Sequence, residues 1–500
     1  MFRTLSTSGL ALIIGAGAVF ADVTPAQVWD NMQRAYVDQG YAVTVGGQDI
    51  AGDVLTVNNV VLALPTEDHS RADITIPRIV FRQDGATVRS IAEGDILMAL
   101  RATDDDDQET GIDVVLTMPG NETVSSGTPD DMRHDFTVPT TTLAARMTDT
   151  TNPTPVTGTM TNLTGWHHVT KTAAGTEQTS EMAADSLDLR MAMTMDRDED
   201  ESHEGELDTL TANLTITGLT GTTAGATPEG ADFNEAPGQA LRDGMAVDAT
   251  LGFASLTGRF DMTGTDEDGE TTAANGEFSG GEMALTLKMS ADGLYYGSTG
   301  RDGRVTLNVP DMPVIDYRIA ETAFGLTMPM LAAEQPQNFA LTYALKGVEL
   351  GQGVWTLFDA ESKLPRDPLN LTIDLSGQAT MKADLTDLAD HEDVPATLHS
   401  LDVNKVALDG AGASANVTGA LTFGEDLTAP TGTINGQFSG VNELVNTLVA
   451  MGLIPQDQAM GARMMIAMFA RPVDGQADVL ATEFEFRDDG SIFANGQQIQ

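Results

Sequence analysis

The feature that most constrains this sequence is an alternation of apolar and polar residues that continues from about residue 44 to the C-terminus. It is clear around residues 210–216, where Leu210, Ala212, Leu214 and Ile216 are separated by polar residues. Residues two apart on a strand point to the same face of a sheet, so the pattern predicts strands with one apolar and one polar face. We therefore expect a mainly β protein with long curved antiparallel sheets or a β-groove. The sequence does not say what covers the apolar faces.

Helical patterns occur at both ends of this β-rich chain. Thr24, Pro25 and Gln27 form a capping-box pattern that predicts an N-terminal helix. Residues 441–470 carry apolar residues at helical spacing on both sides of a break at Gly452 to Pro455, which predicts a helical hairpin. A final strand pair is expected at residues 479–486 and 491–495.

The first 21 residues are typical of a cleavable export signal. Arg3 precedes an apolar run from Leu10 to Phe20, and Val19-Phe20-Ala21 fits the small-residue cleavage pattern. We expect a mature chain that begins at Asp22, is periplasmic and has no transmembrane helix. The chain contains no cysteine, which excludes disulfide bonds.

The mature chain is expected to contain two β-rich regions, residues 22–309 with the leading helix and residues 310–500 with the hairpin. Prolines between Pro310 and Pro336 bracket a less regular stretch, which is the best candidate for a boundary. The Leu-Thr-Gly triplet recurs only at irregular spacings, so a regular repeat architecture is not expected.

A formal net charge of −48 makes nucleic acid an unsuitable partner. Many acids fall in short runs, at residues 104–107, 196–204 and 266–270. These runs are interpreted as solvated hairpin tips, with cation binding as the alternative. The calcium-loop pattern fails in the second run, because Glu201 and Leu207 occupy the positions of the glycine and the closing glutamate.

No catalytic, metal or cofactor site is predicted. The seven histidines form one cluster, His167-His168, and neighbours on a strand point to opposite faces, so the pair is a poor metal site. Nucleophile-elbow, zinc-protease and phosphate-loop motifs are absent from the sequence. A non-enzymatic protein is therefore expected, with a hydrolase using Asp and Glu pairs as a remaining alternative.

The second helix of the hairpin is rich in methionine, a pliable residue that suits apolar partners such as acyl chains. An alternative is that the hairpin closes one end or face of the sheet as core, because helices that are apolar nearly all round are normally buried. The candidate ligand-binding residues of the hairpin are Leu448, Met451, Met460, Met464, Met465, Met468 and Phe469.

One segment resembles a known family. Residues 354–377 contain a cluster of Trp, Pro and charged residues, namely Trp355, Phe358, Asp359, Pro365, Arg366, Asp367 and Pro368. Together with residues 22–29 and 489–496, this segment is similar to an exported proteobacterial family called domain of unknown function 2125. The resemblance implies export and a β-rich fold but no catalytic residues. From the residues themselves we expect the segment to fix packing, with an ion pair between Arg366 and Asp367.

In general style, the chain also resembles periplasmic envelope proteins that handle lipids in long β-grooves. We therefore expect a non-enzymatic periplasmic protein that binds or shields an apolar envelope ligand, most plausibly a lipid, in a curved β-sheet groove. The alternative is a structural or assembly factor that binds another envelope protein through a sheet edge or an apolar face.

Overall fold

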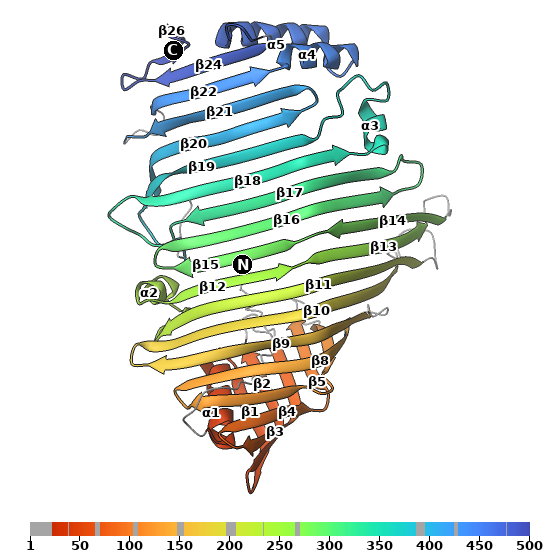
Figure 1. Ribbon diagram of the computed structural model, residues 1–500, viewed down its shortest axis with the longest axis vertical. Coiled ribbons are helices and arrows are strands. Elements are labelled where there is room, and N and C mark those ends of the chain that lie inside the picture. Colours follow the sequence, from red (N-terminus) through yellow and green to blue (C-terminus); the bar gives the residue numbers. More distant parts are fainter. Residues whose placement is uncertain are drawn as a thin grey trace. The chain divides into compact units, whose positions relative to one another are not determined.

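A computed structural model describes most of the chain and confirms a mainly β, antiparallel fold with an N-terminal helix and a C-terminal helical hairpin (Figure 1). Among the described residues there are twenty-six strands and five α-helices. The expected export signal, His69, His203, His391 and nearly all of the acidic runs lie outside these residues. The structure describes residues 23–38, 40–65, 71–103, 109–147, 155–196, 207–233, 235–265, 271–386, 396–424, 429–476 and 478–500.

The chain divides into two compact units. Unit 1 contains Met1–Gly230 and Ala249–Glu277, and unit 2 contains Ala231–Asp248 and Phe278–Gln500. The proline-bracketed stretch from Pro310 to Pro336 lies within unit 2. It holds a regular strand, β17 (Ile315–Met328), whose neighbours pair with it on both sides. Prolines at both ends of a strand disturb only its flanks, because the missing N–H groups lie outside the ladder.

Unit 1 is built from one helix and a series of antiparallel strands. Its elements are α1 (Pro25–Asp38), β1 (Ala42–Ala51), β2 (Val54–Pro65), β3 (Arg71–Asp84), β4 (Thr87–Glu93), β5 (Ile96–Thr103), β6 (Glu109–Thr117), β7 (Glu122–Thr128), β8 (Asp131–Met147), β9 (Val156–Thr172), β10 (Gly175–Asp196), β11 (Leu207–Pro228) and β13 (Ser255–Thr265). Two further strands cross the division between the units, β12 (Ala246–Phe253) and β14 (Thr271–Gly280).

The main core of unit 1 lies between α1 and the first strands. The expected capping box is present, because the Thr24 backbone N–H donates to Gln27 Oε1 at 2.9 Å and the Gln27 N–H donates to Thr24 Oγ1 at 3.4 Å. Trp29 is 2% exposed and its ring centre lies 6.1 Å from that of Phe81 on β3. Burial of such an aromatic side chain contributes about 3 to 5 kcal/mol, judged by the usual cost of truncation to alanine.

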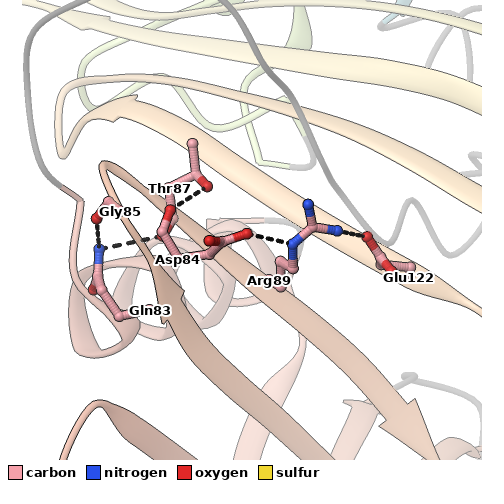
Figure 2. A network of polar contacts seen from close by, with 6 residues as sticks. All are labelled: Gln83, Asp84, Gly85, Thr87, Arg89 and Glu122. Atoms are coloured by element: carbon pink, nitrogen blue, oxygen red, sulfur yellow. Dashed lines mark hydrogen bonds and ion pairs between the residues drawn. The ribbon is translucent and has the colours of Figure 1, made fainter.

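A polar network in the β3–β4 hairpin also holds the residue Val23 before α1, and Figure 2 shows its contacts within the hairpin and to Glu122. The side-chain amide of Gln83 donates to the carbonyl oxygens of Val23, Gly85 and Thr87 at 2.8, 3.0 and 3.2 Å. Arg89 on β4 bridges Asp84 and Glu122, and thereby connects this hairpin to β7. The exposed charges add little stability, whereas the Gln83 amide connects the backbone before α1 to the β3–β4 turn.

The alternation of buried residues shifts by one position in the middle of several strands. On β8, Met132, His134, Phe136 and Val138 are buried before Pro139, and the next buried residue is Thr141. The register places Pro139 beside Asn162 on β9, Asp185 on β10 and Gly218 on β11, a line that we call the crease. Asn162 and Gly218 have φ angles of 52° and 61°. A residue in this left-handed conformation resets the two-residue period, and Asn and Gly adopt it at the lowest cost.

Between β3 and β8 the sheet divides into two branches, because each of these strands changes its partner part-way along. β3 pairs first with β5 and then with β4, while β8 pairs first with β7 and then with β6. Asn121, 5% exposed, lies in the fork, where its side chain donates to the carbonyls of Ala92 and Met118 and accepts from the Ala92 N–H. Pro77 on β3 and Pro139 on β8 occupy the points where the partner strand changes, so their missing N–H groups leave no ladder bond unmade.

Unit 2 continues the antiparallel pattern from β15 to β26. Its strands are β15 (Met283–Ser290), β16 (Gly293–Asn308), β17, β18 (Gln337–Leu350), β19 (Leu369–Met381), β20 (Ala396–Gly410), β21 (Ala413–Thr422), β22 (Thr431–Ser439), β23 (Arg471–Pro472), β24 (Val479–Phe486), β25 (Ile492–Ala494) and β26 (Gln497–Gln498). Its helices are α2 (Pro237–Arg242), α3 (Gln352–Phe358), α4 (Val441–Ala450) and α5 (Gln456–Phe469).

A charged clamp fixes α2 within unit 2. Both guanidinium NH groups of Arg242 donate to the Asp384 carboxylate, at 2.7 and 2.5 Å, and the Ala332 N–H donates to the same group at 2.8 Å. These donors outweigh burial and hold the pKa of Asp384 below its ordinary value, with the Arg242 hydrogen bond as the largest cause. Beside the clamp, Leu241 packs against Met330 and Leu331.

The alternation of apolar and polar residues is weak in β4, β7 and β8, because their buried positions carry Ser, Thr and His as well as apolar residues. Within the part of the chain that the structure describes, no helix has the length and apolar character needed to cross a membrane.

Candidate functional site

The most extensive candidate surface is a row of apolar residues across unit 2. Side chains that face each other across antiparallel strands share one face of the sheet, so the register defines the row directly. From β15 to β24 it contains Leu287, Tyr296, Leu326, Leu341, Leu375, Val403, Gly419, Ile434 and Phe484. At a strand spacing of about 4.8 Å, its eight intervals span about 38 Å. We call this set the apolar row.

The apolar row is only half-buried. Tyr296 is 39% exposed, and the other side chains of the row are of intermediate exposure. In Figure 1, α2 and α3 lie at the ends of strands and α5 lies beyond β24, while α4 contacts β21, so no described helix crosses the middle of the face from β16 to β20. The alternate residues on these strands form a polar face, with Thr342, Asp374 and Asn416 as examples. The sheet of unit 2 is therefore two-faced, and its apolar face is incompletely covered.

The helical hairpin expected at residues 441–470 is present as α4 and α5. Val445 and Ala459 are buried between the helices and the strands, while Leu448 and Met451 are half-buried. The methionines of α5 have the opposite environment, with Met460, Met464, Met465 and Met468 exposed by 65, 63, 57 and 60%. These four side chains are therefore not part of a core, although the hairpin buries Val445 and Ala459. We call them the methionine ridge.

Phe469 connects the hairpin to the apolar row. Its ring centre lies 6.0 Å from that of Phe484, and its carbonyl accepts hydrogen bonds from Thr482 Oγ1 and Asn495 Nδ2. The end of α5 is thus fixed to β24 by one aromatic contact and two polar contacts. Of the seven candidate residues, the structure brings Phe469 to the row and places the four methionines on the outer side of α5.

The family-like segment folds around a buried carboxylate. Asp359 is 2% exposed and accepts the backbone N–H groups of Lys363 and Leu364 at 2.9 and 3.0 Å. Arg366 pairs with Asp359 at 3.1 Å and stacks on Trp355, with its guanidinium carbon 3.9 Å from the ring centre. Burial acts to raise the pKa of Asp359, but the hydrogen bonds and Arg366 together hold it below its ordinary value.

The expected ion pair between Arg366 and Asp367 is wrong, because Arg366 turns back to Asp359. The Arg366 guanidinium also donates to the Asp359 carbonyl and to Ser362 Oγ. Asp367 instead accepts the Gly412 backbone N–H at 3.1 Å. Of the remaining residues, Phe358 packs beside Trp355, and Pro365 and Pro368 belong to the extended chain before β19. All these contacts are internal to the segment or to its immediate support.

A buried polar cluster in unit 1 has no counterpart in the sequence analysis. His134 on β8 is fully buried, its Nδ1 lies 3.1 Å from Ser125 Oγ, and its ring stacks on that of His167 at 6.2 Å. Burial, and secondarily the nearby His167, lower the pKa of His134 well below its usual value. The Nε2 atom of His134 and the hydroxyls of Ser90 and Thr123 have no partner within the described residues.

This cluster cannot act as a serine–histidine catalytic pair, because Ser125 is itself fully buried and a substrate cannot reach it. The alternation did predict that His167 and His168 face opposite ways. His167 pairs in register with His134, whereas His168 is exposed and bonds to Asp131. Among the described residues, no group of three or more His, Cys, Asp or Glu side chains is arranged to hold a metal ion.

The comparisons with known proteins give one family match and no activity. No curated protein matches the chain, and no solved structure matches it. The model of one bacterial family does match, and its range contains the Trp355 segment, the apolar row, the hairpin and the closing strands. Over residues 261–496 the chain thus matches the family described as "Uncharacterized protein conserved in bacteria (DUF2125)", the same family that residues 354–377 resemble.

Proposed function

We propose that this protein is an exported, non-enzymatic envelope protein of the periplasm that binds lipid acyl chains along the apolar row of unit 2. The observation that carries the proposal is a continuous strand register from Leu287 to Phe484 in which every position except Gly419 carries an apolar or aromatic side chain, and these side chains remain half-exposed. Exposed apolar surface that continues over many residues commonly marks a binding surface for an apolar partner. A polar opposite face keeps such a sheet soluble while the apolar face is occupied.

The length of the row supports an elongated ligand. About 38 Å of strand spacing exceeds the roughly 30 Å thickness of a bilayer hydrocarbon core. One or more acyl chains laid across the strands would contact Leu, Ile, Val and aromatic side chains without requiring hydrogen-bond partners. A small polar metabolite would instead need convergent polar groups, which the row does not provide.

Neighbouring residues on β18 offer a matched test, because Leu341 faces the apolar row and Thr342 faces the opposite side. The chain has no cysteine, so Leu341→Cys and Thr342→Cys each introduce one labelling site for a polarity-sensitive fluorophore. Addition of phosphatidylcholine vesicles should shift the emission of the label at position 341 to shorter wavelength and leave the label at position 342 unchanged.

Native mass spectrometry of the wild-type protein purified from its own periplasm gives a second readout. Co-purified lipid, together with the position-specific emission shift, would support acyl-chain binding. Equal responses at both positions, or no response at position 341, would overturn the proposal. A stoichiometric co-purified protein in place of lipid would favour an assembly factor.

A further inference from the structure

The methionine ridge has an arrangement that apolar contact alone does not require. Among the exposed residues of α5 from Met460 to Met468, every large apolar side chain is a methionine. The apolar row in the same unit uses Leu, Ile, Val and aromatic residues. Leucine would provide comparable apolar surface and equal or better helix propensity, so sulfur is the distinguishing property of the ridge.

At 100° per residue, Met464, Met465 and Met468 span a sector of about 100° around α5. Met464 and Met468 are four residues apart and Met465 and Met468 are three apart, spacings at which Cβ atoms lie about 5 to 6 Å from each other. A methionine side chain has three rotatable bonds, which lets thioethers at these positions approach one point. Met460 lies one turn before Met464, at the margin of this sector.

Gly461 leaves space for such a point. It lies inside α5, three residues before Met464 and four before Met465, and a Cβ atom placed there would have no neighbour within 4 Å. Side chains on a helix lean towards its N-terminus, so the flexible side chains of Met464 and Met465 can reach towards this open position. Glycine within a helix costs about 1 kcal/mol relative to alanine, and no packing contact of Gly461 accounts for that cost.

The inner side and the C-terminal end of α5 are held in place, and the helix carries only two charged side chains. Ala459 is fully buried on the inner side, and the Phe469 carbonyl is held by Thr482 and Asn495. The charged groups on α5 are Asp457 in its first turn and Arg463. The guanidinium of Arg463 donates to Asn446 on α4, which directs this cation towards α4.

We propose that Met464, Met465 and Met468 form a site for a soft monovalent cation of the Cu(I) and Ag(I) class, above Gly461. Thioethers select soft ions such as Cu(I) and disfavour hard ions such as Mg²⁺ and Ca²⁺. They carry no proton in the free state, so binding does not require deprotonation of a ligand. The strongly acidic chain provides a field that attracts cations to its surface.

Silver(I) is a suitable probe because it is redox-inert under these conditions. The full-length protein carrying ¹³C-methyl methionine is titrated with silver nitrate in chloride-free buffer. The methyl signals of Met464, Met465 and Met468 should shift together and saturate at one ion per chain. Zinc(II) at the same concentration should leave them unchanged.

Substitution by leucine separates metal binding from apolar contact. The triple variant M464L/M465L/M468L keeps the helix and its apolar surface but removes the three sulfurs, and its silver affinity should fall at least tenfold. Met312→Leu, at a methionine of unit 2 that is 47% exposed, is the matched control and should bind silver as the wild type does. Circular dichroism of each variant verifies folding.

Gly461→Ala gives an independent check, because it adds one methyl group under the expected ion. It should weaken silver binding while it preserves or raises helix stability. Unchanged silver affinity in the triple leucine variant, or methyl signals that do not move, would overturn the proposal. The fluorophore test at positions 341 and 342 reports on the sheet alone, so failure at the ridge is distinguishable from failure of lipid binding.

Discussion

The buried histidine of unit 1 predicts a specific dependence of stability on pH. His134 is fully buried, and desolvation lowers its pKa well below the usual value, so the folded state keeps its imidazole neutral. The unfolded chain exposes the same group, with a pKa near 6.5. Below that pH the unfolded state binds a proton that the folded state does not. The free energy of unfolding therefore falls as the pH is lowered through 6.5 and is unaffected by this group above it.

The magnitude follows from the unfolded-state titration. At pH 5, protonation of one unfolded imidazole favours unfolding by at most about 2 kcal/mol relative to pH 8. His167, whose pKa is also lowered by burial, adds a contribution of the same sign. A change of this size is a large fraction of the roughly 5 to 15 kcal/mol that stabilises a typical domain.

Urea unfolding of the wild type and of His134→Gln at pH 8 and pH 5 measures this term. Glutamine can keep a hydrogen bond to Ser125 but does not titrate, so the loss of stability on acidification should be smaller in the variant, by up to about 2 kcal/mol. An imidazole of His134 that titrates near pH 6.5 in NMR spectra, or a variant with undiminished pH dependence, would refute the reasoning.

Three further substitutions test other parts of the structure. Asp384→Asn removes the charge that Arg242 clamps and should lower the stability of unit 2 by about 2 to 3 kcal/mol in urea unfolding; an unchanged midpoint would contradict the importance of the clamp. Arg366→Lys loses the stacking on Trp355 and the forked contacts, so its unfolding midpoint should fall more than that of Asp367→Asn, and the reverse order would count against the observed pairing. Asn162→Val places a β-branched residue at a φ angle of 52° and should cost about 1 to 3 kcal/mol in thermal unfolding, whereas Asn162→Gly should be tolerated; equal effects would show that the crease is unstrained.

The elements with strong local signals could be predicted from the sequence. The Thr24 and Gln27 capping box, the apolar spacing of residues 441–470 and the turn before the last strands depend on contacts within a few residues. The strands from β7 to β9 could not, because their buried positions include Thr123, Ser125 and His134. Pro139 in the middle of β8 is also a signal against a strand, and it is tolerated only because the partner strand changes there.

Most contacts of the candidate sites could not be predicted from the sequence, because they join residues that are distant along the chain. Arg366 stands next to Asp367, so adjacency favoured that ion pair, but the turn after α3 brings Asp359 within 3.1 Å instead. The clamp between Arg242 and Asp384 joins residues 142 positions apart. For the methionine ridge, helical spacing predicted the helix itself. The exposure of its methionine side chains could not be predicted, because it depends on which side of α5 packs against α4 and β24.

The apolar row and the methionine ridge are proposed to bind by different interactions. The row binds by burial of apolar surface, and the ridge binds by donation of sulfur electron pairs. A half-exposed Leu341 or Leu375 gains free energy from any partner that removes it from water, whatever that partner's chemistry. The thioethers of Met464 and Met468 gain little from such burial that leucine would not gain equally, but only they can donate electron pairs to a soft cation. The two surfaces meet through the contact between Phe469 and Phe484. The variant M464L/M465L/M468L should therefore keep lipid binding along the apolar row and weaken silver binding at least tenfold, so each proposal can fail while the other stands.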